Sequence, residues 1–135
     1  MNYIHIVAIL AIVQFLAFGI LVGRARGRYG IKAPAIGGND HFERHFRVQM
    51  NTLEQLVAFL PALFIAGQYW MNGWVAAIGL VYLVGRLLYR RSYIADPSKR
   101  GPGFLLTVIP TFTLLALGLV GALLQIGRAS CRERV

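Results

Sequence analysis

The chain has 135 residues, of which 57% are hydrophobic and only 14% are charged. Soluble proteins carry about 25% charged residues, so this composition excludes an ordinary soluble domain. The formal net charge is +9, and the cations are clustered, which leaves long uncharged stretches between them. Such stretches are typical of membrane spans. The sequence therefore predicts an integral membrane protein whose cations mark its loops, and no nucleic-acid partner is expected.

The first span is predicted over residues 3–22, about 20 residues or roughly 30 Å of helix. A loop rich in glycine and cations follows over residues 24–39. Asn39 or Asp40 is expected to cap the next helix, because both side chains accept hydrogen bonds from free backbone N–H groups at a helix start.

The second helix is predicted over residues 40–70. Its purely apolar part, residues 56–67, is too short to cross a bilayer alone. The helix must therefore carry polar side chains into or near the membrane. An uncharged turn over residues 71–73 is expected to end it.

The third span is predicted over residues 74–88, and its helix is expected to continue through Tyr93. A second basic loop over residues 94–103 separates it from a fourth span over residues 104–126. The predicted fold class is therefore all-α: an integral membrane four-helix bundle.

Residues 1–127 are predicted to form a single four-span membrane domain. Residues 128–135 differ in character and are interpreted as a tail, hypothesised to be a remnant appended to the native chain. All cations before this tail lie in or beside the first and third connections. The positive-inside rule then predicts both basic loops in the cytosol and both termini on the opposite side. A bacterial inner membrane is the expected location.

Three polar residues of the second helix share one face, because Arg47, Asn51 and Glu54 are spaced i, i+4, i+7. Arg44 lies one turn earlier on the same stripe. Ionisable groups at membrane depth usually face the bundle interior or a wet cavity. Two interpretations stay open: a structural network between helices, or a polar ligand site.

A second stripe follows the third helix, where Tyr82, Arg86, Tyr89 and Tyr93 again share a face. One interpretation is an aromatic belt at the membrane interface with a snorkelling arginine. The other is a second wall of the same ligand site.

Further cations, Arg26, Arg28, Lys99 and Arg100, are predicted at the same membrane face as the two stripes. Each alone is explained by topology signalling. The convergence of all three sets predicts a pocket for an anionic, polar molecule, bounded by apolar helix walls.

No metal site is expected. His41 and His45 are four residues apart, but Phe42 stands where the zinc-protease pattern needs glutamate. The single cysteine, Cys131, excludes a disulfide within the chain. Any thiol chemistry would therefore use the thiol of a substrate.

Two stretches carry a resemblance to a known family. FERHFRVQMNTLE, residues 42–54, and GLVYLVGRLLYRRSY, residues 79–93, resemble the family of membrane-associated proteins in eicosanoid and glutathione metabolism (MAPEG). The resemblance covers residues 3–126. It implies a four-helix bundle that assembles as a homotrimer and binds glutathione between neighbouring subunits near the cytosolic face.

The resemblance also implies site residues. Carried over by motif position, the glutathione ligands are Arg26, Arg47, Gln49, Asn51, Glu54, Tyr89 and Tyr93, and Arg100 is the catalytic residue that activates the thiol. The chemistry agrees, since arginine suits the two carboxylates of glutathione and Glu54 suits its ammonium. A nearby arginine also lowers the pKa of a thiol.

The expected function is a membrane-bound glutathione transferase, with glutathione-dependent peroxidase activity as an addition. Its partners would be glutathione, an apolar electrophile or lipid hydroperoxide, and membrane lipid. Gln55 and Gly27 depart from the leukotriene-synthase branch, which has tyrosine and arginine there, and this disfavours leukotriene synthesis. The alternatives are a non-catalytic lipid-binding accessory protein of the same family and a small transporter subunit.

Overall fold

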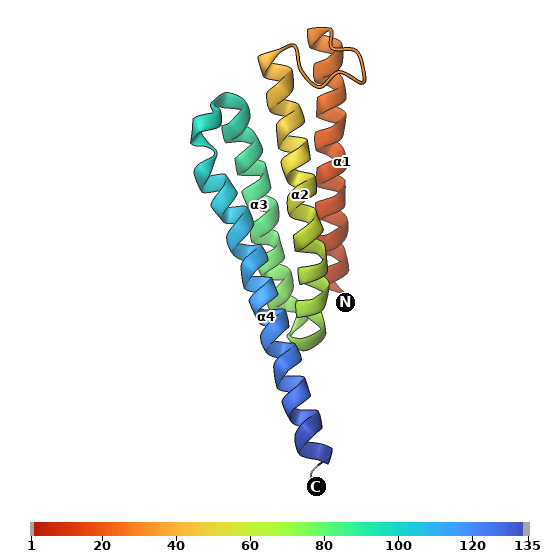
Figure 1. Cartoon of the computed structure of the whole chain (residues 1–135), viewed down its shortest axis with the longest axis vertical. Coiled ribbons are helices and arrows are strands. Elements are labelled where there is room, and N and C mark those ends of the chain that lie inside the picture. The colour runs from red at the N-terminus through yellow and green to blue at the C-terminus, as the bar shows by residue number, and fades with distance from the viewer. Residues whose placement is uncertain (1, 134–135) are drawn as a thin grey trace.

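The computed structural model describes residues 2–133, with the side chains of residues 2–128. Within this part of the chain, four long helices run up and down side by side (Figure 1). They are α1 (Tyr3–Tyr29), α2 (Asp40–Tyr69), α3 (Asn72–Ala95) and α4 (Gly101–Glu133), with a 3₁₀ turn, η1 (Pro97–Lys99), before α4. All four are long and apolar enough to cross a membrane, so the predicted all-α membrane bundle is confirmed.

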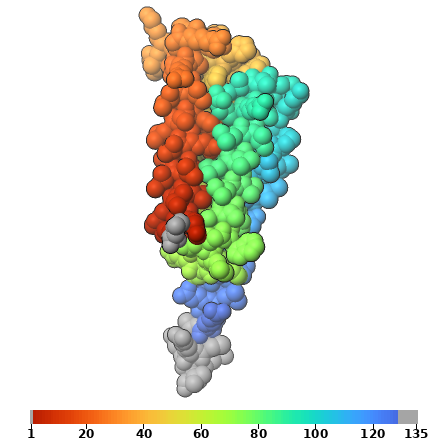
Figure 2. Space-filling view, turned by 180° about the vertical axis from the view of Figure 1, so that it is seen from behind, coloured from red at the N-terminus to blue at the C-terminus, as the bar shows by residue number. Residues whose placement is uncertain are grey.

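The two basic connections lie at one end of the bundle, and the N-terminus and the α2–α3 turn lie at the other (Figure 1). On the opposite face of the molecule, α1 and α3 lie side by side beneath the α1–α2 loop (Figure 2). The α2–α3 and α3–α4 connections are two and five residues long, and such short connections make consecutive helices antiparallel neighbours. Both basic connections are therefore brought to one end of the same bundle.

Helix α1 is longer than the predicted first span. It continues to Tyr29, so Arg24, Arg26 and Arg28 belong to the helix. The prediction that they lie in a loop is wrong. Helical hydrogen bonds do not depend on apolar side chains, and the added turns can extend past the bilayer core. The helix ends where Gly30 adopts φ 70° and donates its N–H to the Arg26 carbonyl, a conformation that favours glycine.

The start of α2 confirms the predicted cap. Asn39 is extended, and its Oδ1 accepts a hydrogen bond from the Phe42 N–H at 3.1 Å. At the other end, the turn is shorter than expected, since α3 begins at Asn72. Trp70 lies in this turn and donates its indole N–H to the Leu117 carbonyl of α4 at 2.8 Å.

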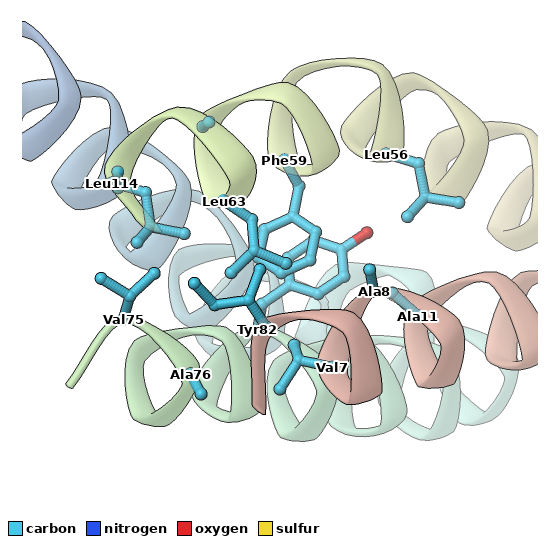
Figure 3. Close-up of a cluster of buried hydrophobic side chains, with 13 residues drawn as sticks. Val7, Ala8, Ala11, Leu56, Phe59, Leu63, Val75, Ala76, Tyr82 and Leu114 are labelled. Atoms are coloured by element: carbon cyan, nitrogen blue, oxygen red, sulfur yellow. The ribbon is translucent and has the colours of Figure 1, made fainter. Parts of the chain in front are cut away.

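The main core lies between the helices, and all four contribute to it (Figure 3). At its centre the rings of Phe59 and Tyr82 are stacked, with centroids 3.8 Å apart and planes 5° apart. The outward faces also carry large apolar side chains, among them Ile9, Val57 and Leu119, which are more than half exposed. Because lipid is as apolar as these side chains, an exposed apolar face is stable in a bilayer.

Glycines set how closely α3 and α4 approach. A Cβ on Gly85 would lie 2.7 Å from the backbone carbon of Leu106. Small residues at such crossings let two membrane helices pack backbone against backbone. The backbones of α3 and α4 therefore lie close together where α3 passes the first turns of α4.

Helix α4 projects past the other three helices (Figure 1), and the backbone is helical through Glu133. Residues 134 and 135 of the predicted tail lie outside the described residues. The division into a membrane domain of residues 1–127 and a tail of residues 128–135 stays a prediction.

Candidate functional site

A pocket of about 490 Å³ lies between α2, α3 and α4, at the end of the bundle that carries the basic connections. Three helices contribute to its walls. The lining residues are Arg47, Met50, Asn51, Glu54, Tyr89, Tyr93, Arg100 and Phe104. Six of the eight predicted site residues are in this set.

Helix α2 contributes the predicted polar stripe. Arg47, Asn51 and Glu54 line the pocket together, as their helical spacing predicted. Arg44 does not join them. Its guanidinium pairs with Asp40 at 3.0 Å and donates to the Ile94 carbonyl at 2.9 Å, so it ties α2 to the end of α3.

The four residues of the predicted polar stripe on α3 lie in two different places. Tyr89 and Tyr93 line the pocket, and their rings stack with centroids 5.6 Å apart. Tyr82 and Arg86 lie further into the bundle, and both side chains are fully buried. The belt interpretation is therefore wrong for this pair, since a snorkelling arginine keeps its charged head in water.

Arg100 is the residue that directly precedes α4. Arg100 follows directly on η1, where Asp96 accepts hydrogen bonds from the Ser98 hydroxyl at 2.8 Å and the Ser98 N–H at 3.1 Å. These two bonds lower the pKa of the Asp96 carboxyl, since both favour its charged form. The adjacent Lys99 does not line the pocket.

Two predicted site residues are not in the pocket. Arg26 donates to the Ala35 carbonyl at 2.6 Å, and its guanidinium lies over the Phe42 ring, 4.8 Å from the centroid. Gln49 directs its amide toward α1, where its Nε2 lies close against Gly19. The expected convergence of all the polar sets on one pocket is therefore only partly correct within a single chain.

Met50 and Phe104 also line the pocket, and neither was predicted as a site residue. Helical spacing offered a signal, because Met50 lies one turn from Arg47 and Glu54, and Phe104 lies one turn after Arg100. Phe104 also packs near Tyr89, with ring centroids 6.4 Å apart. The two residues add an apolar margin to a polar site.

The pocket combines two guanidinium groups, from Arg47 and Arg100, with one carboxylate, from Glu54. Among the described side chains, the ion pair found is Arg44–Asp40, so these three charges are not paired with one another. Arginine forks match carboxylates, and a lone carboxylate suits an ammonium. The site can therefore hold a molecule that carries both signs of charge.

Comparison with known proteins finds relatives that match most of the chain. The sequence model described as the MAPEG family matches residues 4–120. An uncharacterised protein of Synechocystis sp. is 44% identical over 121 residues, which cover 90% of this chain and 85% of that protein. Human microsomal glutathione S-transferase 2 is 39% identical over 122 residues, covering 88% of this chain and 83% of its own. Leukotriene C4 synthase of Cavia porcellus is 35% identical over 132 residues, which cover 93% of this chain and 88% of that protein.

The family match covers α1 from its second residue, all of α2 and α3, and α4 as far as residue 120. Both of the stretches that resembled the family, residues 42–54 and 79–93, lie within it. These stretches carry five of the six predicted site residues that line the pocket. The chain belongs to the MAPEG family, whose members are membrane proteins of eicosanoid and glutathione metabolism.

Proposed function

We propose that this protein is a membrane-bound glutathione transferase that binds glutathione in the pocket between α2, α3 and α4. One observation carries the proposal: six residues predicted to bind or activate glutathione, from α2, α3 and the connection before α4, line one cavity. The name of the human relative, a microsomal glutathione S-transferase, supports the same activity.

The charges of the pocket fit those of glutathione, which carries two carboxylates and one ammonium. Arg47 provides a guanidinium for a carboxylate, and Glu54 provides a carboxylate for the ammonium. Asn51, Tyr89 and Tyr93 add neutral hydrogen-bonding groups. A cavity of about 490 Å³ also lies within the usual range of small-molecule sites, about 300–1,000 Å³.

Arg100 is the residue proposed to activate the thiol. A free thiol has a pKa of about 8.5, and a guanidinium beside it favours the thiolate. The thiol proton passes to water, the sulfur bonds to the electrophilic carbon, and the leaving group departs with the electron pair of the broken bond. Phe104 and Met50, at the apolar margin of the pocket, suit an electrophile that reaches the site from the lipid. Peroxidase activity would use the same thiolate: it attacks the hydroperoxide, the alcohol leaves as the O–O bond breaks, and a second glutathione converts the resulting sulfenic acid to the disulfide with release of water.

The positions of Arg26 and Gln49 fit a site shared between copies of the chain. Both belong to the predicted glutathione ligands, and both lie outside the pocket of their own chain. In a homotrimer, these residues of one copy would complete the pocket of the next. We therefore also propose a homotrimer, oriented so that the pocket end of the bundle lies in the cytosol of a bacterial cell.

The test is stopped-flow ultraviolet absorbance of the detergent-purified protein mixed with glutathione, because a thiolate absorbs where the thiol does not. We expect a saturable thiolate signal in the wild type and none in Arg100→Ala, with glutathione still bound within a few-fold. Lys99→Ala is the matched control, since it removes the neighbouring charge outside the pocket and should retain the signal. A wild type without any thiolate signal would contradict the proposal and favour the lipid-binding accessory function.

A further inference from the structure

Arg86 of α3 lies directly beneath the pocket and is fully buried. Its Nη1 donates to Oδ1 of Asn51 at 2.9 Å, and its Nη2 donates to Oγ1 of Thr52 at 2.8 Å. Its guanidinium also lies 4.3 Å from the centroid of the Tyr89 ring. Two of these three partners, Asn51 and Tyr89, line the pocket.

No carboxylate pairs with Arg86 among the side chains that the structure describes. A buried charge without a partner of opposite sign is costly, and in a membrane helix such a residue usually has a functional reason. Neutral oxygens and an aromatic face satisfy part of the guanidinium, while its Nε has no hydrogen-bond partner. The arrangement is therefore not explained as an ion pair that stabilises the bundle.

The contact with Asn51 fixes which end of that amide faces the cavity. A guanidinium has only donors, so the Asn51 atom at 2.9 Å must be the carbonyl oxygen. This leaves the Nδ2 amide of Asn51 as the polar group available to the pocket. Without Arg86, the amide would be free to rotate and to present its oxygen instead.

We propose that Arg86 is a positioning residue for ligand binding, which locks Asn51 as a hydrogen-bond donor toward an anionic oxygen of the ligand and supports the Tyr89 ring from below. The inference rests on the proposed function, which supplies glutathione as the ligand and its carboxylates as the acceptors. Arg86 does not touch the ligand in this arrangement. It acts on binding through Asn51 and leaves thiol activation to Arg100.

The test is a double-mutant cycle read by equilibrium binding of glutathione, with the variants Arg86→Gln, Asn51→Ala and the combination of both. Arg86→Gln should weaken binding about tenfold, the scale of one lost hydrogen bond to a charged group. In the Asn51→Ala background, the same substitution should change binding by less than about twofold, because the amide through which it acts is absent. The thiolate signal of Arg86→Gln at saturating glutathione should stay unchanged.

Two further variants separate positioning from general stability. Thr111→Val removes another buried hydroxyl whose hydrogen bond, to the Thr107 carbonyl, lies outside the pocket; it should lower the melting temperature and leave glutathione binding unchanged. Asn51→Asp places a carboxylate opposite Arg86 and removes the donor, so it should retain or raise the melting temperature while weakening binding. Where Arg86→Gln does not fold, Arg86→Lys replaces it in the cycle, because lysine keeps the charge but cannot reach both acceptors with one fork.

If the losses in binding free energy caused by Arg86→Gln and Asn51→Ala add in the double variant, the inference is overturned, because Arg86 would then act without Asn51. Full binding by Asn51→Asp would also overturn it, because the donor would be shown to be unnecessary. A wild type that fails to bind glutathione is a separate result, and it contradicts the proposed function itself.

Discussion

A methyl group on Gly103 would lie 2.5 Å from the backbone nitrogen of Tyr89 and 2.6 Å from its Cα. Helix α4 therefore meets α3 backbone to backbone at the level of the pocket. We expect Gly103→Ala to push the two helices apart and cost about 1–3 kcal/mol, as overpacking does. Arg100 and Phe104 precede and follow this contact, so glutathione binding and the thiolate signal should both fall. Thermal denaturation and stopped-flow absorbance measure the two effects.

Gly27→Ala is the control for this prediction. Gly27 also lies inside a helix, but a Cβ there would meet nothing within 4 Å. Alanine in a helix interior is more favourable than glycine by up to about 1 kcal/mol. The melting temperature should rise or stay constant, with thiolate formation unchanged. Equal destabilisation by both substitutions would show that the close contact at Gly103 is not the cause.

Charge removal within the pocket should weaken glutathione binding. We expect about a tenfold loss or more for both Glu54→Gln and Arg47→Ala, because each removes a charged partner of the ligand. Glu43→Gln is the control for the first, since Glu43 lies on the same helix and its Oε1 accepts from the Gly38 N–H outside the pocket. Arg91→Ala, at an exposed position of α3, is the control for the second. Isothermal titration calorimetry gives the affinities, and unchanged values for both pocket variants would favour the structural network between helices.

The connection before Arg100 should depend on pH through Asp96. The pKa of this carboxyl is lowered by its hydrogen bonds from Ser98, so the bonds stabilise the folded state above the ordinary carboxyl pKa. This contribution is lost as the pH falls through the lowered pKa, in the range below about pH 4. Ser98→Ala should therefore lower the melting temperature at pH 7 and have a smaller effect at pH 3.

Ser92→Ala provides the comparison, because Ser92 lies one turn before Asp96 and its side chain is not a hydrogen-bond partner of that carboxyl. Its effect on the melting temperature should be the same at both pH values. A Ser98→Ala effect that is equally independent of pH would contradict the role assigned to the Asp96 carboxyl.

Trp70 should hold α4 against the α2–α3 turn. Its indole N–H donates to the Leu117 carbonyl at 2.8 Å, and Trp70→Phe keeps an aromatic ring while removing the donor. We expect a loss of about 1 kcal/mol, the usual net value of one hydrogen bond, and no change in thiolate formation. Trp74→Phe is the control, since Trp74 is largely exposed. Thermal denaturation of both variants tests the difference.

Helical periodicity made much of the fold and half of the site predictable. Each apolar stretch indicated a span, and the i, i+4, i+7 spacing placed Arg47, Asn51 and Glu54 on one wall of the pocket. The length of α1 was not predictable in the same way. Glycines and arginines after Val22 are typical of a loop, yet the chain keeps its helical hydrogen bonds through Tyr29.

The rest of the site depends on which helices are neighbours. Sequence spacing shows that Arg86 and Tyr89 share a face, but only the packing of α3 on α2 shows that Arg86 is buried against Asn51. The close contact between Gly103 and Tyr89 likewise joins residues of two helices. Spacing within one helix gives no information about either contact.

The buried guanidinium of Arg86 also has a consequence for how the chain enters a membrane. Its two hydrogen-bond acceptors, Asn51 and Thr52, both belong to the preceding helix, so α3 alone would expose an unsatisfied charge to lipid. Only Trp70 and Met71 separate α2 from α3. The two helices are therefore expected to insert together as a hairpin, with the arginine already bound to its partners before either helix meets the hydrocarbon.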